Sequence, residues 1–158
     1  MQDQNPDVAS LRRAAAQGDV EAHYQLALCY DQGLGVAQNF TEAFHWFQKA
    51  AERGHLEAAY QVGQSYSYGI YSSQDYDEAL KWYRQAAAGG HADAQYMMGM
   101  SYLYGISVDP DEAEARRWYQ RAADRGHADS QEALQRLSAD KDSADKDVEE
   151  EFEIREQV

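Results

Sequence analysis

Apolar residues recur along most of the chain at intervals of three and four, the spacing of one face of an α-helix. Within residues 18–53 two such stretches follow each other: Ala22, Leu26 and Tyr30, then Ala43, Trp46, Phe47, Ala50 and Ala51. Between them the segment Gly33-Leu34-Gly35 can adopt the positive φ that ends one helix and turns the chain. The pattern therefore predicts two amphipathic helices joined by a tight turn, here called helix A and helix B.

The same pattern occurs three times without a gap, over residues 18–53, 54–89 and 90–125. Members of the recurring set include three tryptophans and three tyrosines: Trp46, Trp82, Trp118, Tyr30, Tyr66 and Tyr102. Self-similarity at a period of 36 residues is typical of a repeat array whose units are stable only when stacked. We predict an all-α fold, a right-handed α/α superhelical solenoid of about three helix–turn–helix repeats.

Each helix B has a start signal. Asn39, Asp75 and Asp111 stand at the expected N-cap, and Glu42, Glu78 and Glu114 follow three residues later. This pairing predicts a capping box, in which the two side chains satisfy unpaired backbone donors at both ends of the first turn. The alanine pairs near the end of helix B allow close helix packing, and we expect each Trp to fill the space between layers.

These motifs resemble the Sel-1-like repeat, a relative of the tetratricopeptide repeat. In the second copy the matching residues are Ala58, Val62-Gly63, Tyr66, Gly69, Ala79, Trp82-Tyr83 and Ala86-Ala87. Two positions depart from the pattern: Gly35 becomes Tyr71 and Ser107, and the aromatic at Phe40 and Tyr76 becomes Glu112. The resemblance implies an α/α superhelix whose common role is to hold other proteins, and it names no partner.

The ends of the chain complete the predicted organisation. Residues 1–17 align with a helix B and are expected to form an N-terminal capping helix, because Leu11 and Ala14-Ala15 match Phe47 and Ala50-Ala51. Residues 126–137 predict a polar capping helix after the repeats of residues 18–137. Residues 138–158 form an acidic tail with nine acids and three bases, a composition typical of disorder.

Charge and cysteine content narrow the functional classes. A net charge of −14 argues against binding to nucleic acid or to anionic membranes, which needs Lys and Arg, and favours a neutral to basic protein partner. The single cysteine, Cys29, excludes a disulfide scaffold and aligns with Ser65 and Ser101. No apolar run of membrane length and no signal peptide are present, so we expect a cytoplasmic location, or a periplasmic one if a leader has been removed.

Candidate chemistry is sparse. His55, His91 and His127 recur one repeat apart, and equivalent positions in stacked helices lie about 10 Å from each other. Zinc ligands must all lie about 2 Å from one ion, so these three histidines cannot share a zinc site. The carboxylates that open helix B are explained as caps. No nucleophile motif or phosphate loop occurs, and we expect neither a catalytic residue, a metal nor a cofactor.

Lys and Arg within the repeats all lie on helix B or at its exit, and helix A has none. If helix A lines the concave face, the face is acidic at its rim and becomes rich in Met and Tyr toward the third repeat. The candidate partner-binding residues are Leu28, Gln32, Gln61, Gln64, Tyr68, Met97, Met100 and Tyr104, with Gln25 beside them. Tyr and Met supply large, adaptable contact area in binding surfaces.

The leading hypothesis is a non-catalytic adaptor that binds a peptide or a helix in this groove. The alternative is an immunity protein that neutralises a basic toxin or enzyme, and a hydrolase is a remote third reading. A further hypothesis is that the tail, through Phe152 and Ile154, occupies the groove of its own chain or of a second copy, which would lead to self-association.

Overall fold

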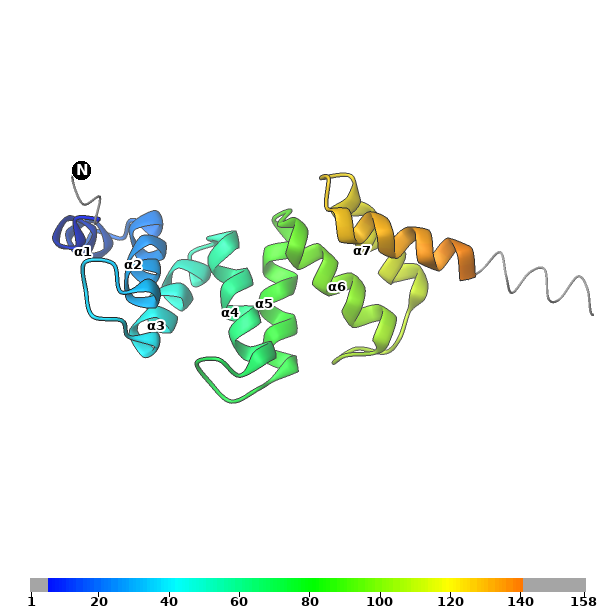
Figure 1. Cartoon of the computed structure of the whole chain (residues 1–158), viewed down its shortest axis with the longest axis horizontal. Helices are drawn as coiled ribbons and strands as arrows, with labels where there is room; N and C mark the ends of the chain where they lie inside the picture. Colours follow the sequence, from blue (N-terminus) through cyan, green and yellow to red (C-terminus); the bar gives the residue numbers. More distant parts are fainter. Residues whose placement is uncertain (1–5, 141–158) are drawn as a thin grey trace, which may run out of the picture.

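The computed structural model describes residues 6–140 of the 158-residue chain. Seven helices are followed by an eighth over residues 128–140, and the described part contains no strand. The helices are α1 (Val8–Ala16), α2 (Val20–Gln32), α3 (Phe40–Glu52), α4 (Leu56–Tyr68), α5 (Tyr76–Ala88), α6 (Ala92–Tyr104) and α7 (Glu112–Ala123). Each helix packs against the next one in the chain, in an elongated stack with α1 and the last helix at opposite ends (Figure 1). This confirms the predicted all-α solenoid.

Helices α2, α4 and α6 are the predicted A helices, and α3, α5 and α7 are the B helices. Each A helix ends at a left-handed glycine, with φ of 72° at Gly33, 64° at Gly69 and 68° at Gly105. The next amide, such as that of Ile70, donates to the carbonyl of Ser65 and satisfies a carbonyl at the end of the helix. The helix lengths and turns therefore follow the sequence pattern closely.

The two departures at the second turn position have different outcomes. Ser107 keeps the positive φ of Gly35, at 58°. Tyr71 does not, and its side chain reaches back to the first repeat instead. There its hydroxyl donates to Oδ1 of Asp31 at 2.5 Å, and its ring packs on Phe40 and Phe44. A bulky residue in this turn is thus stabilised by contacts between repeats.

The N-caps of the B helices are confirmed, but the capping box is not reciprocal. Asp75 accepts from the amides of Asp77 and Glu78, each at 3.0 Å, as a cap should. Its own amide donates to the carbonyl of Tyr66 at 2.9 Å. The amides of Asn39 and Asp111 donate in the same way to the carbonyls of Tyr30 and Tyr102. A carbonyl of the preceding A helix therefore accepts the hydrogen bond that a capping box assigns to the glutamate side chain.

The core is built from small residues and from the aromatic that follows each Trp. Ala50, Ala51, Ala86 and Ala87 are buried between helices, together with Phe47, Tyr83 and Tyr119. The tryptophans are half-buried and pack against this core from its edge, and Lys49 and Arg121 cover two of them. The expectation that Trp fills the space between layers is therefore met only in part: Trp46 packs against both core clusters, but the ring one residue after each Trp is the more deeply buried.

The ends also carry helices. α1 packs on α2 through Ala15, Ala22 and Leu26, as a capping half-repeat would. The last helix covers residues 128–140, so residues 138–140 of the predicted tail are helical. Arg116 holds this helix to α7 by donating to the carbonyl of Leu137 at 2.6 Å. Residues 1–5 and 141–158, with the tail residues Phe152 and Ile154, lie outside the described part.

Candidate binding face

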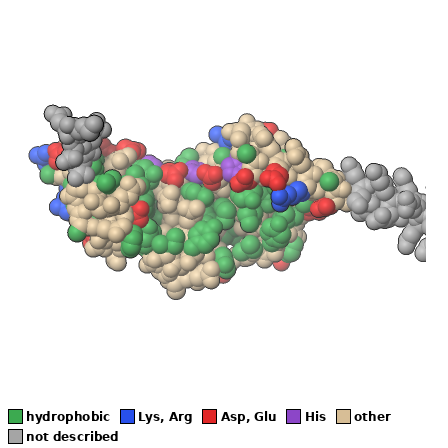
Figure 2. Space-filling view, in the orientation of Figure 1, with side chains coloured by type: hydrophobic (Ala, Val, Ile, Leu, Met, Phe, Trp, Pro, Cys, Tyr) green, Lys and Arg blue, Asp and Glu red, His purple; other side chains and the backbone are tan. Residues whose placement is uncertain are grey.

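A broad apolar surface extends over α4, α6 and the last helix, and is called here the apolar face. Its most prominent members are Tyr68 and Tyr104, which are 65% and 66% exposed. Both stand in the last turn of an A helix, one repeat apart. Met97 and Met100 of α6 lie beside them, half-buried. In Figure 2 hydrophobic side chains gather below a row of acidic and histidine side chains. Large aromatic rings exposed in this way are not demanded by the fold.

Three of the eight predicted groove residues are exposed and five are half-buried, and of these Leu28 and Met97 pack against the core. Gln32 is exposed, and the half-buried members are Leu28, Gln61, Gln64, Met97 and Met100. Gln61 and Gln64 are engaged locally: Gln61 donates to Glu57 at 3.0 Å and Gln64 to the hydroxyl of Tyr60 at 2.9 Å. Met97, Met100, Tyr68 and Tyr104 line two hollows of this face.

The first hollow lies between the second and third repeats and has a volume of about 160 Å³. Tyr68, Met97 and Met100 line it from the A helices. Sequence reasoning missed several other members, among them Tyr76, Leu80 and Tyr83 of α5 and Ile106 of the turn after α6. Tyr76 is 48% exposed at the start of α5. The signal in the sequence was an aromatic residue at the first position of a B helix, Tyr76 here and Phe40 in the first repeat.

The second hollow lies between α6 and the last helix and has a volume of about 490 Å³. Tyr96, Leu103 and Tyr104 line it on one side, with Tyr119 at its base. The last helix contributes Asp129, Glu132, Ala133, Arg136, Leu137 and Asp140. Burial and then the negative charge of Asp129 raise the pKa of Tyr96 above its ordinary value of 10.0. This hollow is therefore both aromatic and acidic.

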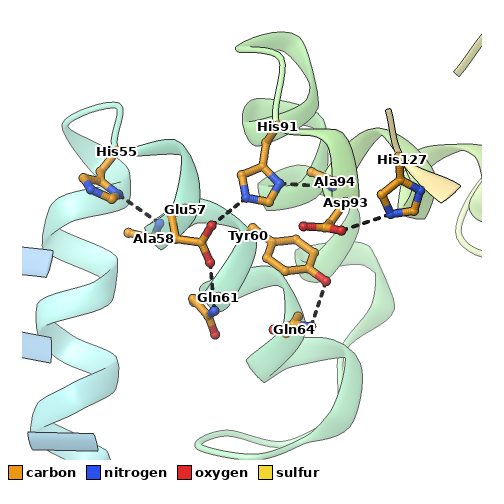
Figure 3. Close-up of polar contacts among 10 residues, drawn as sticks. All are labelled: His55, Glu57, Ala58, Tyr60, Gln61, Gln64, His91, Asp93, Ala94 and His127. Carbon is orange, nitrogen blue, oxygen red and sulfur yellow. Dashed lines mark hydrogen bonds and ion pairs between the residues drawn. The ribbon is translucent and has the colours of Figure 1, made fainter. Parts of the chain in front are cut away.

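A row of histidine–carboxylate contacts runs along the start of the A helices, beside the apolar face (Figures 2 and 3). The Nε2 atoms of the histidines that begin one A helix lie close to a carboxylate of the preceding A helix. The pairs are His55 with Glu21 at 3.3 Å, His91 with Glu57 at 2.7 Å and His127 with Asp93 at 3.0 Å. Each contact thus joins two successive repeats.

The other ring nitrogen of each histidine caps its own helix. The amide of Ala94 donates to Nδ1 of His91 at 3.3 Å, and the amide of Ala58 donates to His55 in the same way at 3.1 Å. Because Nδ1 accepts, the neutral ring carries its proton on Nε2 and donates it to the carboxylate. The hydrogen bond from His91 lowers the pKa of Glu57 below its ordinary value of 4.5, against the opposing effect of burial.

The recurring histidines therefore have a structural role that spacing alone did not reveal. Each also packs against a tyrosine of the preceding repeat: His55 on Tyr24 at 4.3 Å between ring centroids and His91 on Tyr60 at 4.7 Å. Burial raises the pKa of Tyr60 to about 12. Within residues 6–140, no group of three His, Cys, Asp or Glu side chains is placed to hold a metal ion.

The predicted distribution of positive charge is confirmed for the described helices. α2, α4 and α6 contain no Lys or Arg, and their only charged side chains are Glu21, Asp31, Glu57 and Asp93. Cations lie on α3, α5 and α7, where Arg117 pairs with Glu114 and Arg116 with Glu112. The apolar face is thus bordered by negative charge.

Cys29 is buried in α2, and burial raises the pKa of its thiol.

The fold and this face define an α-solenoid of stacked helix pairs that offers an uncovered apolar surface. A family model described as Sel1 repeat matches the chain three times, at residues 20–55, 56–91 and 92–127. The chain belongs to the Sel1 repeat family, as the motifs indicated. Sel1 repeats generally mediate protein–protein interactions, and proteins built from them are typically non-catalytic scaffolds.

Solved structures agree with this assignment. A Sel1 repeat protein from Oxalobacter formigenes superimposes with a TM-score of 0.79 at 37% identity, over 82% of this chain and 97% of that one. The protective antigen c5321 of uropathogenic Escherichia coli, which displays an SLR fold, gives 0.72 at 40% identity over 76% of this chain and 26% of its own. The cysteine-rich protein B of Helicobacter pylori shares the fold, with a TM-score of 0.62 at 22% identity. A search of curated proteins produced no match.

Proposed function

We propose that the protein is a non-catalytic adaptor that binds a segment of another protein, a peptide or a helix, on its apolar face. The observation that carries this proposal is the exposure of Tyr68 and Tyr104 beside two hollows. Rings that are 65% and 66% exposed contribute little to folding, whereas exposed aromatic rings next to pockets are typical anchors of an interface.

The chemistry of the remaining side chains supports a binding role rather than catalysis. The three histidines that lie beside carboxylates use Nδ1 to cap their own helices and Nε2 to bridge repeats. The Cys29 thiol is buried, and its raised pKa favours the unreactive protonated form. The three histidines thus have structural tasks, and the thiol is kept in its protonated form. Within residues 6–140, all helices are too short or too polar to cross a bilayer.

The negative charge around the face supports a partner that is neutral to basic, and argues against nucleic acid or an anionic membrane as the ligand. The alternative of an immunity protein that blocks a basic toxin or enzyme would use the same face and stays a prediction. A cytoplasmic location also stays a prediction, as do self-association through the tail and its contacts through Phe152 and Ile154.

The test compares the full-length protein with its Tyr68→Ser/Tyr104→Ser variant. Each protein is immobilised and used to capture partners from a lysate of its source organism. A captured protein is then purified and titrated against both forms by calorimetry. We expect affinity to fall at least about tenfold, in the range of interface hot spots, with an unchanged melting temperature.

Leu34→Ser is the matched control, because Leu34 is 36% exposed in the turn of the first repeat and lines neither hollow. It removes exposed apolar area without touching the apolar face, so its affinity should equal that of the wild type. A partner that binds both the control and the double variant as tightly as the wild type contacts another surface, and the assignment of the apolar face fails.

A further inference from the structure

The two hollows of the apolar face are neighbours with opposite character. Met100 lines both of them, so they lie side by side, one on each side of α6. They belong to successive gaps between layers of helices, and packed helices lie about 10 Å apart. One bound segment can therefore reach both hollows at once, and the chemistry of each hollow restricts one side chain of that segment.

The hollow between the second and third repeats accepts an apolar side chain. Its buried hydroxyls already have partners inside the protein: Ser67 Oγ lies 3.0 Å from the hydroxyl of Tyr83, and Ser101 Oγ donates to the carbonyl of Met97 at 2.9 Å. A volume of about 160 Å³ is close to that of an apolar cavity that takes up benzene, about 150 Å³. A side chain the size of Leu or Phe fits this space and needs no hydrogen bond there.

The hollow between α6 and the last helix accepts a cation. Three carboxylates line it, from Asp129, Glu132 and Asp140, against the single guanidinium of Arg136, which leaves a net charge of −2. Arg136 is already paired with Glu132 on its own helix. The rings of Tyr96 and Tyr104 border the same space, and aromatic faces attract Lys and Arg. The adjacent α6 contributes no positive charge.

We propose that the bound segment carries a Leu- or Phe-sized side chain and a Lys or Arg roughly 10 Å from it, the first seated in the apolar hollow and the second in the acidic hollow. This inference rests on the proposed function and names the chemistry of the partner. The separation corresponds to about three residues of an extended segment, at roughly 3.3 Å each. In a helix it corresponds to about seven residues, at roughly 1.5 Å each.

The test selects peptides from a random 16-residue display library on the full-length protein. Enriched peptides that lose binding to the Tyr68→Ser/Tyr104→Ser variant are kept, since these use the apolar face. We expect them to share a large apolar residue and a Lys or Arg at one of the two separations. A parallel selection on Asp129→Lys/Glu132→Lys should enrich Asp or Glu at the position of the base.

A milder variant guards against misfolding of the charge-reversed protein. Asp129→Asn/Glu132→Gln keeps the shape of both side chains, and its melting curve is recorded alongside. One enriched peptide, made synthetically, should bind it about three- to thirtyfold more weakly, because the two neutral amides no longer attract the cation while the tyrosine rings remain in place. A Lys→Gln version of that peptide should bind both proteins equally.

The outcomes separate the two levels of the argument. If no enriched peptide depends on Tyr68 and Tyr104, the proposed function is overturned and this inference with it. Another outcome is that the peptides depend on the tyrosines but share no Lys or Arg, or that the selection on Asp129→Lys/Glu132→Lys enriches the same Lys or Arg. Either result means that the apolar face binds segments and that the acidic hollow is not a cation site. A shared base without an apolar residue overturns the part of the inference that concerns the apolar hollow.

Discussion

Tyr83 lies against Gly63 so closely that a Cβ atom at residue 63 would come within 2.7 Å of two ring carbons. The same relationship recurs one repeat later, where Gly99 faces Tyr119 with a corresponding distance of 2.5 Å. In the first repeat this position is Ala27 and its partner ring is Phe47. The close approach of α4 to α5 therefore requires a residue without a side chain.

Gly63→Ala is expected to lower the free energy of unfolding by about 1–3 kcal/mol, the usual cost of overpacking a core. This loss should appear even though alanine favours a helix by about 1 kcal/mol over glycine. Denaturant unfolding followed by circular dichroism measures it. In the double variant Gly63→Ala/Tyr83→Leu the effects should be less than additive, since leucine lacks the ring carbons in contact. A stabilised Gly63→Ala protein would show that the ring moves aside freely.

The aromatic pair of a single helix B offers a direct comparison of burial. Tyr83 is 2% exposed, whereas Trp82 is half-buried at the edge of the core. Tyr83→Ala should therefore cost about 3–5 kcal/mol, and Trp82→Ala clearly less, although tryptophan is the larger residue. Chemical denaturation of both variants decides the order. An equal or larger loss of stability for Trp82→Ala would show that Trp82 contributes to the core at least as much as Tyr83.

The contact between His91 and Glu57 predicts a dependence of stability on pH. Its hydrogen bond lowers the pKa of Glu57 in the folded state, so this group stabilises the fold above the ordinary glutamate value of 4.5. The stabilisation is lost as the pH falls through the lowered pKa. Glu57→Gln should thus be less stable than the wild type near neutral pH, and the difference should shrink toward pH values of about 3.

Unfolding at several pH values measures this difference, and Glu52→Gln on the exposed side of α3 is the control. A constant gap between wild type and Glu57→Gln at every pH would mean that the carboxylate charge does not contribute. His91→Ala should remove the same pH-dependent part together with the cap, and the loss of the cap alone should cost about 0.5–2 kcal/mol.

Cys29 should behave as a buried small residue rather than as a reactive thiol. Burial raises the pKa of the thiol, so labelling by a thiol reagent in the native state should be slow and should accelerate on unfolding. Cys29→Ser should change the stability by less than about 1 kcal/mol, because the equivalent Ser65 donates to the carbonyl of Gln61 at 2.8 Å. Fast stoichiometric labelling of the native protein would contradict this reading.

The sequence by itself determined the repeat architecture, because its signals are local and periodic. The apolar spacing around Leu26 or Val62 specifies one face of a helix, and a cap such as Asp75 or a glycine such as Gly69 acts within one turn of the chain. These effects depend on neighbours a few residues away, so a single chain shows them without tertiary information.

The tertiary structure alone decided which groups meet across repeats. His91 and Glu57 are 34 residues apart, and their contact follows from the angle between successive helix pairs, which no local pattern states. Within one repeat, the packing of α4 on α5 turns Tyr83 rather than Trp82 into the core, against Gly63. The stacking of successive repeats brings Tyr76 and Ile106 beside Met100, and Asp129 beside Tyr96, so both hollows form only where separate layers meet.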